Sequence, residues 1–507
     1  MFMIAFRRED GYHENINSLQ ENKMDHTLIR NYFYNILYTI VRIALPFILA
    51  PYTYAHVGPA SLGIYQFAGS IMNWFILFGI LGINIYGNRQ IARVRNDREE
   101  LSRTFSEIFS VQVLDMLIAI AAFYLFIQTT VTENLFYYQL TGLTMIASMC
   151  DITWFFYGVE DFKNVTIRNI IIRCTGVALI FLLVKSSADL WLYILINVCT
   201  ELAGQIVMFF QLPQYISFRK VSIRDAYHHH FHATFRLFVP TIATSVYTML
   251  DTTMIGYLYS EEHVQFYQSA MNPIRTILTF ITSIGSVVLP RVSNLYYSQK
   301  DGKEKAQSLV NTTMKIAMFL ALPICLGVLA ISQHFMAWYI PGYPILGELM
   351  MLGCPIIVLI SMSNVIGTQY MIPTGLDKEY TRAVITGSAV NLVCNSLLIP
   401  KFGAIGAVIG SVAAETAVTI TEAYMIRGRV HFGFRNRSYR IYIFGAALMF
   451  AAVYSSNYYL RVNAGSTLLQ ILIGILIYYL VLRVAKEDLC MRILSGLRNH
   501  IVHNRQK

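Results

Sequence analysis

The stretch "YQFAGSIMNWFILFGILGINIYG" (residues 65–87) is apolar over the length that an α-helix needs to cross a bilayer, about 20 residues. A second stretch, "YQSAMNPIRTILTFITSIGSVVLP" (residues 267–290), opens with almost the same four letters. Both stretches carry polar residues at helical spacing within an apolar run. The sequence therefore predicts membrane helices, and the second copy of the motif raises the expectation of an internal repeat.

The composition of the whole chain also indicates a protein that lies in a lipid bilayer. Of its 507 residues, 55% are hydrophobic and 13% are charged, whereas soluble domains carry about 25% charged residues. Continuous apolar runs of helix length favour α-helices over a β-barrel, whose strands are about 10 residues long. We therefore predict an all-α polytopic membrane protein with about fourteen transmembrane helices, at residues 31–52, 60–86, 108–128, 134–157, 166–184, 189–211, 237–258, 269–290, 307–332, 345–370, 380–399, 404–425, 441–459 and 464–482.

The positive charge of the chain indicates its orientation in the membrane. The formal net charge is +10, and Lys and Arg gather in segments such as 88–103 and 427–440. The expected outer loops hold only Lys185, Lys401 and Arg461. This distribution follows the positive-inside rule, so both termini are expected in the cytoplasm. The basic composition is therefore a topology signal, and no nucleic-acid partner is expected.

Three short matches in the same order relate the two halves of the chain. The first match, at the YQxA motif, pairs Gln66 with Gln268, Ser70 with Asn272 and Asn73 with Arg275. The second pairs "GVED" (158–161) with "GLDK" (375–378), and the third pairs Glu201 with Glu415. Each repeat holds six expected spans, so both halves enter the membrane in the same orientation. Such parallel repeats are related by an axis along the membrane normal, with the substrate path between the halves.

This repeat predicts the domain organisation of the chain: two six-helix lobes and two additional C-terminal helices. The expected parts are a cytoplasmic segment at 1–30, a first lobe at 31–212, a cytoplasmic linker at 213–236, a second lobe at 237–426, a cytoplasmic loop at 427–440, two additional transmembrane helices at 441–483 and a cytoplasmic tail at 484–507.

Charged and polar side chains within the expected spans are the candidates for the substrate path. An ionisable group inside a membrane helix costs about 2.5–3.5 kcal/mol on insertion scales, so it usually faces a partner or a wet cavity. Arginine presents a planar fork of donors that suits phosphate oxygens. The candidate substrate-binding residues are Arg42, Arg275, Arg173, Lys315, Asn73, Gln268 and Asn272. Together they would suit an anionic ligand such as a diphosphate. The alternative is that the cations pair with acids and hold helices together.

Several acids also lie within expected spans. Glu201, Glu415 and Asp251 are the candidates for binding a coupling ion, H⁺ or Na⁺, with helix pairing as the alternative; Asp115, Asp151 and Glu422 are further acids in spans. No catalytic residue, cofactor or metal site is expected, because the seven cysteines are scattered and no nucleotide-binding or hydrolase motif is present. The histidines of "HHH" (228–230), followed by His232, are interpreted as part of a solvated inner loop.

Longer stretches carry a resemblance to a known family. They are "NILYTIVRIALPFILAPYTYAHVG" (35–58), "LGINIYGNRQIARVRNDREELSRTFSEI" (81–108), "WFFYGVEDFKNVTIRN" (154–169), "GTQYMIPTGLDKEYT" (367–381) and "NLVCNSLLIPKFGAIGAVIGSVAAE" (391–415). These stretches resemble the bacterial lipid-linked oligosaccharide flippases of O-antigen and capsule biosynthesis. That family belongs to the same superfamily as the multidrug extruders and the lipid II flippases, and the resemblance covers roughly residues 28–485.

The resemblance implies a function, a location and a set of partners. It implies translocation of an undecaprenyl-diphosphate-linked oligosaccharide across the bacterial cytoplasmic membrane by alternating access, with membrane lipids and polysaccharide-assembly proteins as partners. The resemblance implies functional cations in the central cavity, with Arg42 and Arg275 as candidates. Two additional C-terminal helices also occur in this superfamily, and in the lipid II flippases such a pair forms a groove for the lipid tail. Two alternatives stay open: a cation-coupled exporter of drugs or organic solutes, and a membrane glycosyltransferase or polymerase.

Overall fold

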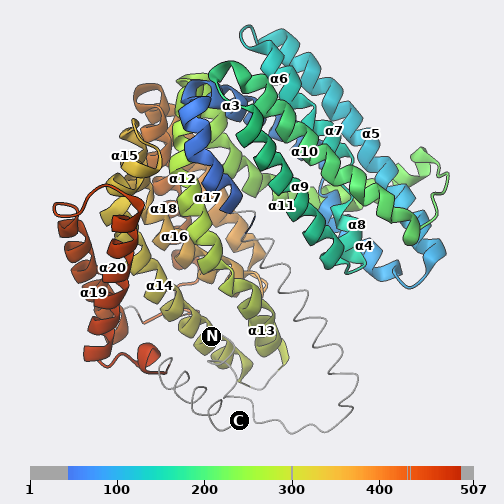
Figure 1. The fold of residues 1–507 in the computed structure, drawn as a ribbon. Helices are drawn as coiled ribbons and strands as arrows, with labels where there is room; N and C mark the ends of the chain where they lie inside the picture. Colours follow the sequence, from blue (N-terminus) through green and yellow to red (C-terminus); the bar gives the residue numbers. More distant parts are fainter. Residues whose placement is uncertain (1–40, 42–43, 299–300, 431, 434–435, 493–507) are drawn as a thin grey trace, which may run out of the picture. The chain divides into compact units, whose positions relative to one another are not determined.

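The computed structural model describes residues 41, 44–298, 301–430, 432–433 and 436–492. Within these ranges the structure is helical and holds no β-strand (Figure 1). Eight helical stretches among them are long and apolar enough to cross a membrane. The chain forms two compact units, divided after Phe266; the short segment Ile399–Gly403 belongs to the first unit. The predicted fold class is confirmed, whereas the count of fourteen spans is not.

The first unit is built mainly from nine α-helices among its described residues. They are α3 (Pro59–Ile80), α4 (Ile83–Val94), α5 (Arg98–Thr130), α6 (Leu135–Gly142), α7 (Thr144–Met149), α8 (Thr153–Gly158), α9 (Phe162–Leu183), α10 (Leu190–Gln211) and α11 (Ile223–Leu258), with the short turns η1 (Ser187–Asp189) and η2 (Leu212–Gln214). Long helix α5 packs against α3, α4 and α11. An aromatic core at one end of this unit centres on Phe105, Trp154 and Phe155, all buried.

The expected span 134–157 is a broken helix, and one glutamine explains how the breaks are tolerated. The chain leaves helical geometry between α7 and α8, which exposes backbone carbonyls that a membrane interior cannot satisfy. The amide nitrogen of Gln112 in α5 donates to the carbonyl oxygens of Asp151 (2.8 Å) and Met149 (3.0 Å). Its amide oxygen accepts from the indole N–H of Trp154 at 2.9 Å. One side chain therefore bonds to both sides of the break.

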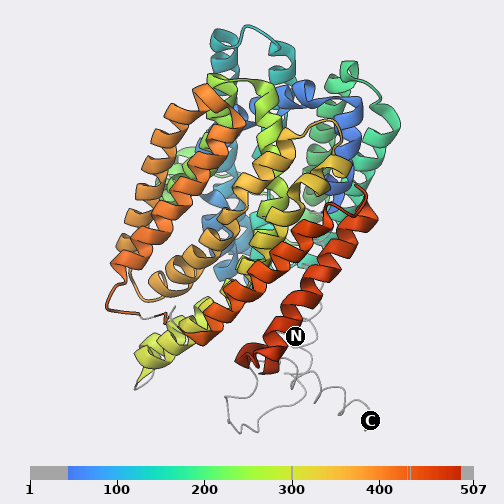
Figure 2. The same cartoon turned by 90° about the vertical axis from the view of Figure 1, so that its left-hand side faces the viewer.

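The second unit contains the remaining helices. They are α12 (Glu261–Thr282), which begins in the first unit, α13 (Ile284–Ser298), α14 (Gly302–Tyr339), α15 (Ile345–Gly353), α16 (Pro355–Ser363), the π-helical segment η3 (Asn364–Met371), α17 (Asp377–Phe402), α18 (Ala404–Met425), α19 (Arg437–Ser456) and α20 (Ala464–Val484). Helices α19 and α20 lie side by side (Figure 2). Both pack on α14, where Tyr478 donates to the carbonyl of Phe319 at 3.0 Å.

Two expectations about element boundaries change in the structure. The expected span 237–258 is the later part of a 36-residue helix, α11, that already begins at Ile223. Much of the expected linker 213–236 is therefore helical, and the boundary between the compact units follows Phe266. Helix α11 continues because no proline or glycine interrupts it before Pro240, and it packs on α3, α4 and α5.

Helix bounds support the predicted repeat, which stays a prediction. Helices α3 and α12 are both 22 residues long and begin 202 residues apart. Helices α10 and α18 are also both 22 residues long and begin 214 residues apart. These offsets are the same as those of the matched residues Gln66 with Gln268 and Glu201 with Glu415.

Candidate functional site

In the second unit, the polar stripe of α12 holds a guanidinium at the protein surface. Arg275 is exposed, and its Nη1 donates to the amide oxygen of Gln268, two helical turns earlier, at 3.2 Å. Its guanidinium carbon lies 5.7 Å from the ring centroid of Tyr267, a cation–π geometry. The Tyr267 hydroxyl lies 3.3 Å from Ser411 Oγ of α18. Because a guanidinium has five N–H donors, Arg275 keeps donors for a ligand.

Two other predicted residues lie in this unit without joining that cluster. Asn272 is exposed on α12, next to Pro273 within the helix. A proline at this position removes the backbone hydrogen bond to the carbonyl of Ser269. Lys315 lies on α14, is partly buried, and forms no ion pair with any carboxylate of the described residues. The structure therefore brings together Gln268 and Arg275, and it places Lys315 on a different helix.

In the first unit, Arg173 pairs with an acid. Its Nη2 lies 3.5 Å from Glu201 Oε1, and this ion pair connects α9 with α10. Both side chains are partly exposed. This contact is the helix pairing that the sequence left open as the alternative for both residues. A partly exposed ion pair of this kind contributes about 0–1 kcal/mol. The pair is therefore a weak contact that a competing ligand can open.

The matching stripe of α3 divides between two surfaces. Asn73 is exposed, whereas Ser70 is buried against α11, where the Thr253 hydroxyl lies 3.4 Å from Ser70 Oγ. The indole N–H of Trp74 donates to the same Thr253 oxygen at 3.0 Å. Of the first-half stripe, Asn73 is therefore exposed, whereas Ser70 contributes to packing between helices. Arg42 lies outside the residues that the structure describes.

The three predicted ion-coupling acids have different environments. Asp251 of α11 is 4% exposed and Glu415 of α18 is 7% exposed, whereas the Glu201 side chain is 47% exposed. A fourth acid, Glu422, is fully buried beside Ser363 and Glu415, and neither of its carboxyl oxygens makes a hydrogen bond of normal geometry. Gly367 of η3 leaves room for this carboxyl group. Because Glu415 and Glu422 are seven residues apart on one helix, their spacing is a signal that could have added Glu422 to the candidates.

A groove lies between the ends of α19 and α20. It has a volume of about 640 Å³ and is lined by Arg437, Arg440, Ile441, Phe444, Leu480, Val481, Val484 and Ala485. Arg437 Nη2 donates to the carbonyl of Ala485 at 3.2 Å, which fixes one cation at the rim. The groove therefore combines two guanidinium groups with an apolar wall.

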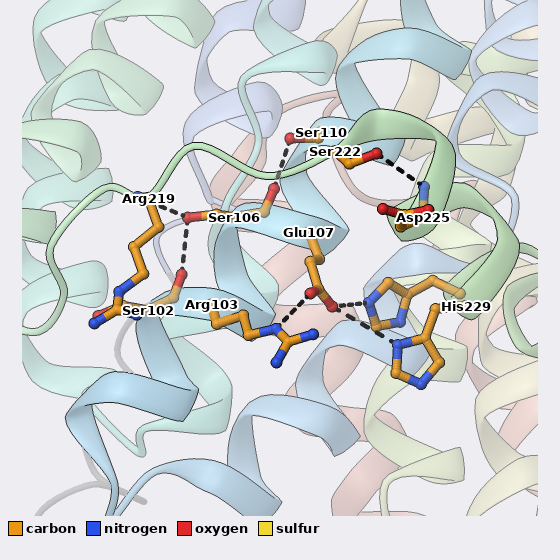
Figure 3. A network of polar contacts seen from close by, with 10 residues as sticks. Ser102, Arg103, Ser106, Glu107, Ser110, Arg219, Ser222, Asp225 and His229 are labelled. Carbon is orange, nitrogen blue, oxygen red and sulfur yellow. Dashed lines mark hydrogen bonds and ion pairs between the residues drawn. The ribbon is translucent and has the colours of Figure 1, made fainter.

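The histidine run lies in α11 and not in a loop, so the solvated-loop interpretation is wrong for His230. This residue is 4% exposed, and its Nε2 lies 2.9 Å from Glu107 Oε2 of α5 (Figure 3). Burial lowers the pKa of His230, and the hydrogen bond with Glu107 opposes that shift. Sequence reasoning missed this contact because the two residues are 123 positions apart.

These observations define a class of protein: a multi-pass helical membrane protein. Among solved structures, "Lipid II flippase MurJ, inward closed conformation" shares this fold with a TM-score of 0.72 at 18% identity, covering 91% of this chain and 99% of that chain. The model of the polysaccharide biosynthesis protein family matches residues 28–296, and the chain belongs to this family.

The match to two relatives with transporter names extends over most of the length of each relative. A "Putative O-antigen transporter" of Escherichia coli (strain K12) is 24% identical over 423 residues, which are 81% of this chain and 98% of the relative. A protein with the same name from Shigella dysenteriae is 26% identical over 395 residues, 74% of this chain and 94% of the relative. The family and these relatives together indicate that the chain is a membrane transporter.

Proposed function

We propose that this protein translocates an undecaprenyl-diphosphate-linked oligosaccharide repeat unit across the bacterial cytoplasmic membrane, for surface polysaccharide such as O-antigen or capsule. The observation that carries the proposal is Arg275, an exposed cation on α12, a helix that the sequence predicts to enter the membrane. Gln268 and Tyr267 of the same helix contact its guanidinium. A guanidinium held in this way binds a diphosphate without reorganising. The names of the O-antigen transporters support the substrate class.

The groove of α19 and α20 supports a substrate with a lipid tail. Its two arginines and its wall of Phe444, Leu480 and Val484 suit a molecule with an acidic head and an apolar chain. The resemblance to lipid II flippases implies such a groove at the two C-terminal helices. Within the proposal, the groove receives the prenyl chain while the arginine-bearing helices receive the diphosphate. Membrane lipids and polysaccharide-assembly proteins remain the proposed partners.

The proposed cycle is alternating access of the two lobes around this substrate, coupled to H⁺ or Na⁺. Arg42, Arg173, Arg275 and Lys315 are the proposed cations for the substrate, with Asn73, Gln268 and Asn272 as polar contacts. Glu201, Glu415 and Asp251 are the proposed coupling acids, and their buried members, Asp251 and Glu415, suit a group that exchanges a cation with a wet cavity.

Complementation of a bacterial strain that lacks its own flippase tests the proposal. Arg275→Ala is expected to abolish surface polysaccharide, because it removes the cation and its fork of donors. Arg275→Lys keeps the charge but loses bidentate binding, and is expected to reduce export at least tenfold. Arg461→Ala, in the segment between α19 and α20, is the matched control and is expected to export normally. Surface polysaccharide is measured with the amount of membrane protein checked by blot. Normal export by a normally produced Arg275→Ala protein contradicts the proposed role.

A further inference from the structure

A carboxylate and two histidines meet near one end of the first unit, away from the stripes of the proposed substrate path. Glu107 Oε2 of α5 lies 2.9 Å from His230 Nε2 and 3.8 Å from His229 Nδ1, both of α11. These three potential ligand atoms all lie within 4.8 Å of one another. Figure 3 shows the imidazole of His229 facing the Glu107 carboxylate, whose opposite contact is with Arg103. One carboxylate oxygen with two imidazole nitrogens is a donor set typical of zinc.

The outer contacts of these side chains hold them in the orientation that a metal needs. Arg103 Nε donates to the other carboxylate oxygen, Glu107 Oε1, at 2.8 Å. Arg103 therefore leaves Oε2 to the histidines. Tyr86 of α4 places its hydroxyl 2.7 Å from His230 Nδ1. A histidine that binds metal through one nitrogen usually donates its other N–H to an oxygen, and the Tyr86 hydroxyl can accept it.

Two of the three ligand side chains are largely buried and the third is exposed, so the cluster is accessible from solvent on one side. His230 and Glu107 are largely buried, with side-chain exposures of 5% and 12%, whereas His229 is 73% exposed. The exposed side of the cluster offers a path for an ion and a place for a water ligand. Three protein ligands and one water complete a four-coordinate zinc site.

We propose that Glu107 Oε2, His229 Nδ1 and His230 Nε2 bind a Zn²⁺ ion, with water as the fourth ligand. Binding replaces the proton shared between His230 and Glu107 with the metal. The ion connects the beginning of α11 with α5 within the first unit. It therefore stabilises the packing of the part of α11 that the sequence predicted to be a linker. This site is independent of the proposed transport function.

The test uses the full-length protein in detergent, purified through a tag that contains no histidine. After equilibration with Zn²⁺ and dialysis, elemental analysis is expected to find one zinc per chain in the wild type. Glu107→Gln and His230→Asn are expected to lose it. His229→Asn changes only an exposed side chain, so it should fold normally and bind Zn²⁺ at least tenfold more weakly by calorimetric titration.

His228 and His232 provide the matched controls, because both are exposed on the same helix outside the cluster. His228→Asn and His232→Asn are expected to keep the wild-type affinity and the wild-type zinc content. Co²⁺ in place of Zn²⁺ should give the visible absorption of a four-coordinate site in the wild type and in both control variants. Absence of stoichiometric zinc in the wild type overturns the proposal. So does zinc that is lost in the control variants, or wild-type affinity in folded His229→Asn.

Discussion

At the scale of single residues, Tyr267 and Gln268 determine where the charge of Arg275 lies. Tyr267 stands eight residues and Gln268 seven residues before the arginine, so two helical turns bring them to the same face. The amide oxygen of Gln268 and the ring face of Tyr267 both attract the guanidinium, at 3.2 Å and 5.7 Å. A cation held by neutral groups keeps its full charge for a ligand, whereas the cation of Arg173 is compensated by Glu201.

This difference leads to a prediction for Gln268. Gln268→Leu keeps the size of the side chain but removes the amide oxygen that orients Arg275. We expect weaker binding of substrate with little loss of protein, because Gln268 is only partly buried. The expected result is a several-fold loss of polysaccharide export at normal membrane abundance in the complementation assay. Asn311→Leu, a partly buried amide on α14, serves as the comparison for an unspecific loss of a polar group.

A second prediction at this scale concerns the proton on Glu422. An ionised carboxylate without hydrogen bonds is very costly in an apolar interior, so the group is expected to hold its proton. Glu422→Gln should therefore shift the melting temperature in detergent by less than about 2 °C. Glu422→Asp has the same charge but is shorter, and is expected to destabilise more because it leaves a cavity. A strong destabilisation by Gln alone contradicts a neutral carboxyl group.

At the scale of elements, side chains from a neighbouring helix supply the hydrogen bonds that a break in a helix leaves unmade. The segment 135–158 forms three short helices where one span was expected. Gln112 of α5 donates hydrogen bonds to backbone carbonyls at the break between α7 and α8. Trp154 of α8 packs against α4, where a Cβ on Gly87 would lie 2.5 Å from the indole. Glycine at position 87 is required by this close approach.

The break gives a prediction for α5. Gln112→Leu leaves the Trp154 N–H and the carbonyl of Asp151 without their partner, and each buried group left unpaired costs about 1–3 kcal/mol. We expect a clear decrease in the melting temperature of the purified protein. Gln128→Leu, exposed near the end of the same helix, is expected to have no measurable effect. Equal stability of the two variants contradicts the role of Gln112.

At the scale of the whole molecule, the arrangement of charge predicts the orientation in the membrane. Lys and Arg are abundant in 88–103 and 427–440, and scarce in the expected outer loops. Helices α19 and α20 are joined by a short segment that contains Arg461, and α19 begins at Arg437. The positive-inside rule places the joining segment outside and the beginning of α19 inside.

Cysteine labelling in intact cells checks this orientation. In a variant without native cysteines, Arg461→Cys is expected to react with a membrane-impermeant thiol reagent. Gly428→Cys, before α19, is expected to react only after the cells are opened. The opposite pattern contradicts the predicted topology, and labelling of both positions in intact cells contradicts a membrane span between them.

The sequence alone determined that the protein lies in a membrane and that its elements are α-helices. The thickness and low dielectric of a bilayer directly set the helix length and the apolar composition. It also determined that Gln268 and Arg275 share a face, since helical periodicity sets that contact locally. Only the tertiary structure decided which residues from distant segments meet. Glu107 meets His230 across 123 positions, and Glu201 and Glu415, matched in sequence, differ in burial. Such contacts depend on how whole helices pack, and local periodicity carries no information about the partner helix.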